Sequence, residues 1–131
     1  MKDCYAASQT GVGMQVVGSN IKVISNTVED ILEYECMFIV DRGGSVFKNS
    51  TVRRCKRNGM RINSSNPSTY ADNTFDSTTG TSIVVDGGFD FDGNTITGNR
   101  IIGSGADGIE LNYGSGAMAV AGNVIVNSAE N

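Results

Sequence analysis

The first candidates for acid–base chemistry in this chain are its carboxylates, because its 131 residues include no histidine. Without histidine the commonest general base is missing, and so is every Ser-His or Cys-His nucleophile. The candidate carboxylates are Asp86, which ends the segment S-I-V-V-D, and Glu110, inside G-I-E-L, with Asp107 just before it. Two carboxylates at a set separation are what glycoside hydrolysis requires. The separation depends on the elements that carry them.

Those elements recur along the whole chain. Six anchor positions, spaced 22 to 26 residues apart, each stand two residues before an apolar position; they are Cys4, Asn26, Ser50, Asn73, Asn99 and Asn123. Ten residues after the anchors lie Met14, Cys36, Met60, Ile83 and Ile109. Twelve residues after them lie Val16, Phe38, Ile62, Val85 and Leu111. This apolar–any–apolar pattern has a period of two and predicts strands with one buried face.

A repeat of roughly 20–30 residues built from short strands is typical of a solenoid. Each repeat predicts one strand at the G-I-x-L segment, a second before the anchor and a third after it. We therefore expect a single domain spanning residues 1–131, with parallel sheets along its axis. The anchor Asn is predicted to occupy a bend, to tolerate the left-handed backbone region and to bond the same Asn one coil away.

Three segments leave the regular pattern. Residues 27–37 also fit a helix with a capping box at Thr27 and Asp30, but the repeat register passes through them and favours a regular coil. Residues 63–72 hold the only proline and are predicted to bulge as a loop. In the long interval 87–99 we expect a loop insertion, with the second strand of that coil at residues 89–91.

The stretch N-T-I-T-G-N-R-I-I-G-S-G-A-D-G-I-E-L, followed by A-V-A-G-N-V-I-V-N-S, resembles the repeat of the right-handed parallel β-helix superfamily. That superfamily includes pectin and pectate lyases, polygalacturonases, alginate epimerases and phage tailspikes. The resemblance implies an all-β right-handed parallel β-helix of about six coils, with three short parallel strands per coil. It also implies a polysaccharide partner, a groove along one sheet, an extracellular or virion-surface location and a possible homotrimer. The implied activity is that of a glycoside hydrolase or of a lyase, and a lyase would need a calcium cluster or a basic Lys or Arg that abstracts the proton.

In this register Asp86 and Glu110 fall on adjacent coils, two residues apart along the strand. One coil step of about 4.8 Å and two residues of about 6.6 Å separate them by about 8 Å, which suits an inverting pair. Asp107 is a third candidate. Candidate substrate-binding residues are Arg61, Asn112 and Tyr113, the last as a stacking ring.

Two further features bear on binding. Arg53-Arg54-Cys55-Lys56-Arg57, with Arg61, is either a solvated turn or a site for acidic polysaccharide. Asp86, Asp90 and Asp92 could hold calcium, and we expect no other cofactor. The histidines of the polygalacturonase and epimerase patterns are absent, so a non-catalytic structural or adhesive solenoid is the alternative function.

The cysteines are predicted to be buried free thiols, with a lone disulfide as the alternative. A net charge of −4 and 18% charged residues argue against a general nucleic-acid binder. No apolar run is long enough to span a membrane, and the N-terminus lacks the apolar region of a signal peptide. No capping helix is expected at either end, which predicts a piece of a longer protein or coils covered by partner subunits.

Overall fold

The computed structural model of the chain describes residues 1–64, 67–86, 93–112 and 117–129. These residues form sixteen strands and no helix. Sheet I contains β1 (Tyr5–Ala7), β4 (Thr27–Ile31), β7 (Thr51–Cys55), β10 (Thr74–Asp76), β13 (Arg100–Ile102) and β16 (Val124–Val126). Sheet II contains β2 (Met14–Gly18), β5 (Met37–Asp41), β8 (Met60–Ser64), β11 (Ile83–Val85) and β14 (Ile109–Leu111). Sheet III contains β3 (Lys22–Ile24), β6 (Val46–Lys48), β9 (Thr69–Ala71), β12 (Thr95–Thr97) and β15 (Ala119–Ala121).

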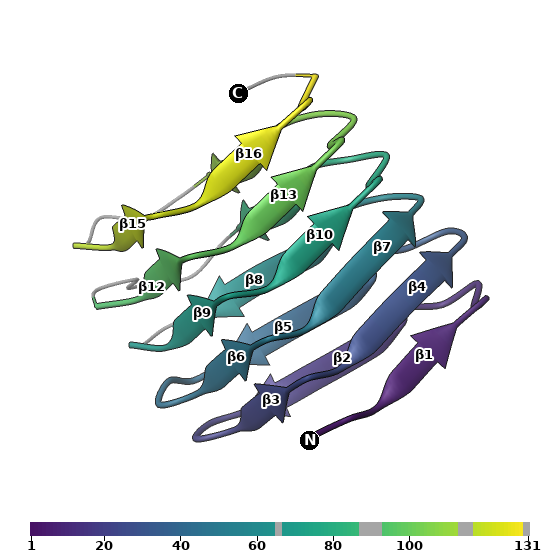
Figure 1. Cartoon of the computed structure of the whole chain (residues 1–131). Coiled ribbons are helices and arrows are strands. Elements are labelled where there is room, and N and C mark those ends of the chain that lie inside the picture. Colours follow the sequence, from purple (N-terminus) through teal and green to yellow (C-terminus); the bar gives the residue numbers. More distant parts are fainter. Residues whose placement is uncertain (65–66, 87–92, 113–116, 130–131) are drawn as a thin grey trace.

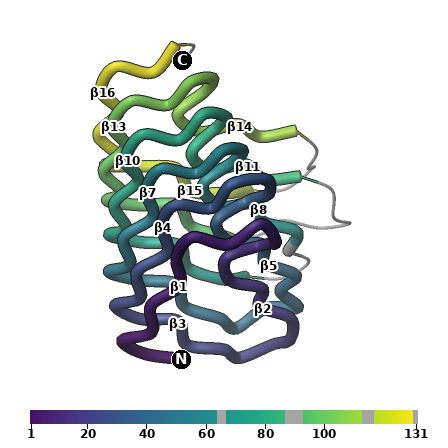
Figure 2. The backbone as a smooth tube through the Cα atoms, turned by 90° about the vertical axis from the view of Figure 1, so that its right-hand side faces the viewer, coloured from purple at the N-terminus to yellow at the C-terminus, as the bar shows by residue number. Residues whose placement is uncertain are grey.

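The strands stack as the coils of a solenoid. Each strand pairs in parallel with the corresponding strand one coil away, as β4 does with β7. Figure 1 shows sheet I rising from β1 to β16, and Figure 2 shows the chain winding as a stack of coils between the two termini. The described residues make five complete coils and one additional strand in sheet I. The predicted parallel solenoid with three strands per coil is therefore confirmed, close to the expected six coils.

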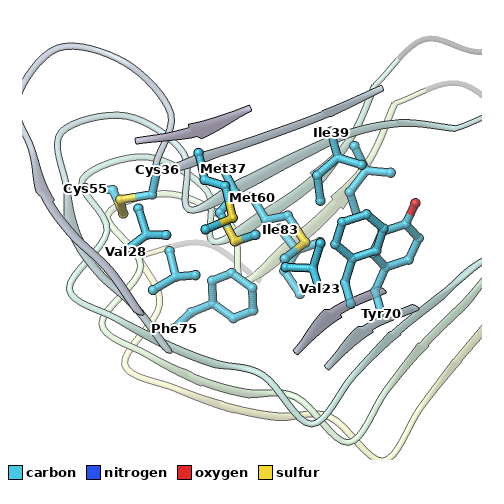
Figure 3. Close-up of a cluster of buried hydrophobic side chains, with 14 of the residues drawn as sticks. Val23, Val28, Cys36, Met37, Ile39, Cys55, Met60, Tyr70, Phe75 and Ile83 are labelled. Carbon is cyan, nitrogen blue, oxygen red and sulfur yellow. A yellow bond between two sulfur atoms is a disulfide. The ribbon is translucent and has the colours of Figure 1, made fainter. Parts of the chain in front are cut away.

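Columns of apolar side chains from all three sheets fill the interior. Sheet I contributes Val28, Val52, Phe75 and Ile101, and sheet III contributes Val23, Phe47, Tyr70 and Ile96, all buried. The rings of Phe47 and Tyr70 stack with centroids 5.1 Å apart. Figure 3 shows Phe75 of sheet I and Val23 and Tyr70 of sheet III on the same inner side as Met37 and Met60 of sheet II. Burial of each large apolar side chain contributes about 1.5–3 kcal/mol, so the repeated columns drive the stacking.

The predicted asparagine ladder is present. Asn73 Nδ2 donates to Asn99 Oδ1 over 3.1 Å, and Asn99 Nδ2 donates to Asn123 Oδ1 over 2.9 Å. The bend conformation differs from the prediction, because the left-handed residue is the one before each anchor. Its φ is 58° at Ser25, 55° at Asn49 and 66° at Gly98. The anchor itself must point its amide inward along the stack, and its predecessor turns the chain.

The second coil departs from the predicted register by one residue. Met37 pairs with Met14 and Met60, so the prediction that Cys36 occupies this apolar column is wrong. Phe38, predicted to face inward, instead pairs with Gln15 and Arg61 in an outward row. The physical reason is one additional residue in the turn between β4 and β5. A shift of one residue in a strand reverses the face of every side chain in it.

Sheet III also corrects two expectations. Residues 69–71, predicted to lie in a loop, form β9 and pair with β6 and β12. The strand expected at residues 89–91 lies outside the described residues, and the sheet III strand of that coil is β12 at Thr95–Thr97. In each coil the strand directly precedes the anchor bend, whatever loop comes earlier. The helix considered for residues 27–37 is absent, because β4 occupies their first half.

The prediction of three buried free thiols is wrong. Cys36 and Cys55 form a disulfide with a Cα–Cα distance of 5.7 Å, and both are buried. Cys4 is free and exposed. Cys36 precedes β5 and Cys55 ends β7, so one turn of the solenoid brings them to the same corner. Figure 3 shows this bridge beside Val28. A separation of 19 residues in sequence does not reveal that closeness unless the coil geometry is known.

Candidate functional site

Sheet II presents two outward rows of side chains. The first row contains Gln15, Phe38, Arg61, Val84 and Glu110, which pair in sequence across β2, β5, β8, β11 and β14. The second row lies two residues further along the strands and contains Asn63, Asp86 and Asn112. Here the backbone amides of Asp86 and Asn112 donate to the backbone carbonyls of Ile62 and Val85. Parallel pairing in register thus places polar side chains of three coils side by side.

A cleft of about 510 Å³ lies over β8, β11 and β14 and the turns that precede them. Its lining residues are Glu35, Lys56, Arg57, Asn58, Arg61, Thr79, Gly80, Val84, Asp86, Glu110 and Asn112. Three of these side chains are cationic and three are carboxylates, so the cleft combines both signs of charge. Such a mixture suits a polar ligand with hydroxyl groups better than an apolar one.

Arg61 lies at the centre of the cleft. Its Nη2 pairs with Asp86 Oδ2, and its Nη1 lies 3.7 Å from Glu35 Oε1. The guanidinium also lies over the ring of Phe38, with Cζ 5.9 Å from the ring centroid. The Arg61 side chain is 41% exposed, whereas that of Glu35 is 8% exposed. One cation therefore bridges two carboxylates that come from different coils.

The two carboxylates expected to do chemistry both line this cleft. Glu110 pairs with Val84, so Asp86 lies on the adjacent strand and two residues further along, as the sequence register predicted. Glu110 Oε2 accepts a hydrogen bond of 3.2 Å from the Thr81 hydroxyl. Glu110 is half-buried and Asp86 is partly exposed. The arrangement offers two differently held carboxylates on one face.

The remaining candidates are placed less uniformly. Arg61 and Asn112 line the cleft, as expected of substrate-binding residues. Asp107 precedes β14, and its carbonyl accepts the Ser82 amide over 3.1 Å, but it does not line the cleft. Tyr113 lies outside the described residues. Of the candidate substrate-binding residues, Arg61 and Asn112 therefore lie in the cleft, and their role in binding stays a prediction.

Glu35 was missed by reasoning from sequence. It shares a row with Asn58, Thr81 and Asp107, just before the strands of sheet II, because the Cys36, Gly59 and Ser82 amides donate to the carbonyls of Asn58, Thr81 and Asp107. An acid immediately before an apolar strand was an available signal. Its burial was not, since that depends on the one-residue shift in the second coil.

The basic cluster divides between two faces. Arg53 and Arg54 lie on sheet I, where both pair with Glu29, and Arg54 also pairs with Asp30 over 2.6 Å. Lys56 and Arg57 line the cleft instead, and Arg57 Cζ lies 5.5 Å from the centroid of Tyr34. The alternation of side chains along β7 and the turn after it separates residues that are consecutive in sequence.

On sheet I, hydrogen bonds shift the pKa values of several side chains. The pKa of Glu29 is held below its ordinary value first by the hydrogen bond from Arg53 and then by that from the Tyr5 hydroxyl. The same hydrogen bond to Glu29 raises the pKa of Tyr5. The hydrogen bond from Arg54 lowers the pKa of Asp30. This network joins three coils and lies on sheet I, apart from the cleft of sheet II.

No group of three or more His, Cys, Asp or Glu side chains in the described ranges is arranged to hold a metal ion. Two of the three predicted calcium ligands, Asp90 and Asp92, lie outside the described residues. Within the part of the chain that the structure covers, no helix has the length and apolar character to cross a membrane.

Comparison with known families agrees with this architecture. A family model described as the right-handed beta helix region matches residues 1–125. The chain belongs to this right-handed β-helix family. No curated protein and no solved structure matches the chain. Family membership defines the coils and their handedness, while the chemistry has to be argued from the site.

Proposed function

We propose that the chain binds a polysaccharide along the outer face of sheet II and cleaves its glycosidic bonds in the cleft. The observation that carries the proposal is that Asp86 and Glu110 line one cleft from adjacent strands. The strand spacing and the two-residue offset separate their backbone positions by about 8 Å. An inverting glycosidase needs its carboxylates about 6.5–9.5 Å apart, with a water molecule between one of them and the sugar.

The two carboxylates have different partners. Asp86 is ion-paired with Arg61 and is assigned as the general base. Glu110 accepts a hydrogen bond from the Thr81 hydroxyl and is assigned as the general acid. Asp86 takes a proton from water as that water attacks the anomeric carbon. Glu110 gives its proton to the glycosidic oxygen, whose bond to that carbon breaks.

Other lining residues support saccharide binding. Val84 lines the cleft in the same row as Arg61 and Glu110, and it is 4% exposed, so it closes the floor of the cleft between them. Asn58 and Asn112 provide amides for sugar hydroxyl groups, and Lys56 and Arg57 provide cations for acidic substituents. The Cys36–Cys55 disulfide supports the proposed extracellular or virion-surface location, because disulfides persist in oxidising surroundings. Trimeric assembly stays a prediction of the family resemblance.

The test is an assay of the purified chain on a panel of acidic and neutral polysaccharides. We expect Glu110→Gln and Asp86→Asn each to lower the cleavage rate by about 10²–10⁴-fold. Gln15→Ala is the matched control, because Gln15 lies in the same outward row but outside the cleft. Full cleavage by both carboxylate variants would refute the assignment. A product with an unsaturated sugar end, seen by ultraviolet absorption, would identify a lyase instead.

A non-catalytic structural or adhesive solenoid is the second candidate. It is favoured by the fact that Asp86 and Glu110 already have protein partners in Arg61 and Thr81. Binding of a polysaccharide without cleavage, unaffected by Glu110→Gln, would support the adhesive role. Neither binding nor cleavage across the panel would support a purely structural one.

A further inference from the structure

The Arg61–Asp86 pair conflicts with the proposed role of Asp86. A general base must accept a proton from water, and here a guanidinium already occupies Asp86 Oδ2. Water or a saccharide hydroxyl can take the place at Asp86 Oδ2 only if Arg61 has a second position.

Glu35 offers that position. Three acids are buried in the described part of the chain, and two of them are fully engaged. Asp41 accepts hydrogen bonds from the Gly43 amide and the Ser45 and Tyr70 hydroxyls, and Glu29 accepts from Tyr5 and two arginines. Among these described residues Glu35 makes no side-chain hydrogen bond. Its contact is the 3.7 Å ion pair with Arg61 Nη1.

Glu35 lines the cleft, and its 3.7 Å ion pair with Arg61 is longer than a hydrogen bond, so a closer approach of Arg61 to Glu35 would add a charge-assisted hydrogen bond. We infer that the Arg61 guanidinium has two positions. It pairs with Asp86 in the free protein, and it pairs with Glu35 when a saccharide hydroxyl or water contacts Asp86. Glu35 is thus a positioning residue of the cleft. The catalytic role of this exchange rests on the proposed function, whereas the two positions of Arg61 are a property of the free protein.

The surroundings suit a moving arginine and a fixed glutamate. Glu35 adjoins the disulfide-bonded Cys36, whose amide donates to the Asn58 carbonyl over 3.0 Å. The Arg61 side chain is 41% exposed, so its end has room to swing. The ring of Phe38 lies under the guanidinium and can hold it by a cation–π contact during the exchange. When Arg61 pairs with Glu35, the saccharide hydroxyl or water takes its place at Asp86.

The two positions of Arg61 can be tested without any ligand. In protein labelled with ¹⁵N-arginine, exchange of the Arg61 Nη–H protons with water is measured by NMR, and Arg61→Lys assigns the signals. Arg100, an exposed arginine of β13, is the internal reference. In Asp86→Asn we expect Arg61 to stay at least about 10-fold better protected than Arg100, because Glu35 receives it. In the Glu35→Gln/Asp86→Asn variant it should exchange as fast as Arg100.

Exchange in Asp86→Asn as fast as that of Arg100 would overturn the inference. This comparison needs no Glu35 variant, so it still decides if Glu35→Gln fails to fold. On a polysaccharide that the wild type cleaves, Glu35→Gln should lower kcat about 10-fold with little change in KM. Glu33→Gln, an exposed acid of the same turn, should leave both unchanged; an unchanged kcat in Glu35→Gln would refute the positioning role. If no polysaccharide is cleaved, the proposed function fails while the NMR result still stands.

Discussion

At the scale of single residues, Asn99 joins three coils through one buried side chain. Its Oδ1 accepts a hydrogen bond of 3.0 Å from the backbone amide of Asn73. Its Nδ2 donates to the Tyr70 carbonyl over 3.0 Å and to Asn123 Oδ1. These groups lie in the interior, where water cannot replace a missing partner. The ladder therefore both selects the coil register and satisfies backbone groups at the bend.

Asn99→Ala is expected to destabilise the chain by about 2–4 kcal/mol, because it leaves several buried polar groups without partners. The measurement is chemical denaturation followed by circular dichroism. Asn49→Gly is the control, since Asn49 is exposed and its φ of 55° is accessible to glycine. Equal, small effects of the two substitutions would show that the ladder contributes little.

The Glu29 network predicts a dependence of stability on pH. The pKa of Glu29 is lowered in the folded state, so its contribution is present above the ordinary carboxyl pKa and is lost as the pH falls through the folded-state value. We expect the Tm to decrease as the pH falls from about 5 to about 3, and to decrease less in Glu29→Gln. Glu33→Gln should follow the wild type. A Glu29→Gln curve parallel to the wild type would contradict this.

At the scale of elements, the corner between sheets I and II uses different chemistry in different coils. Cys36 and Cys55 close one coil by a disulfide. Ser82 occupies the equivalent of Cys36 and Ser104 the equivalent of Cys55, and their hydroxyls are hydrogen-bonded. Both serines are buried. The corner geometry therefore recurs, and the residue types decide whether the link is covalent.

Ser82→Cys/Ser104→Cys is consequently expected to form a second disulfide without disturbing the fold. Mass spectrometry should show the loss of two hydrogens, and the free energy of unfolding should rise by about 1–3 kcal/mol in the oxidised protein. Each single cysteine variant is the control and should give no such gain. Two persistent free thiols under oxidising conditions would show that the two corners are not equivalent.

At the scale of the whole molecule, the fold is built from contacts about one coil apart. Strand pairs such as β1–β4 and β10–β13 join residues 22 and 26 positions apart, and each sheet is parallel throughout. Parallel pairing of this kind has no hairpin to nucleate it. The chain therefore loses the entropy of closing a loop of one coil before any strand pair can contribute stabilising free energy.

This topology predicts slow folding. With the disulfide intact, refolding from denaturant is expected on a scale of about milliseconds to seconds rather than microseconds. Stopped-flow circular dichroism measures it, and the solenoid requires the signal to develop as strand with no helical phase. Refolding within microseconds would mean that local contacts dominate, contrary to the observed pairing.

Much of this architecture was readable from the sequence. The period of 22 to 26 residues, the three strands per coil, the asparagine ladder and the offset between Asp86 and Glu110 all follow from patterns that recur along the chain. Recurrence makes them robust, because each coil repeats the same local preference for a buried column and a bend. An error in one coil leaves the others in register.

Tertiary structure alone decided the features that depend on how many residues each turn holds. One additional residue before β5 turns Phe38 outward, brings Cys36 to the corner beside Cys55 and buries Glu35 beside Arg61. The basic cluster is divided between two faces because β7 ends at Cys55, so that Lys56 and Arg57 lie in the turn beside the cleft. Side-chain period fixes only alternation within a strand, whereas contacts between coils depend on the lengths of the turns, which composition does not reveal.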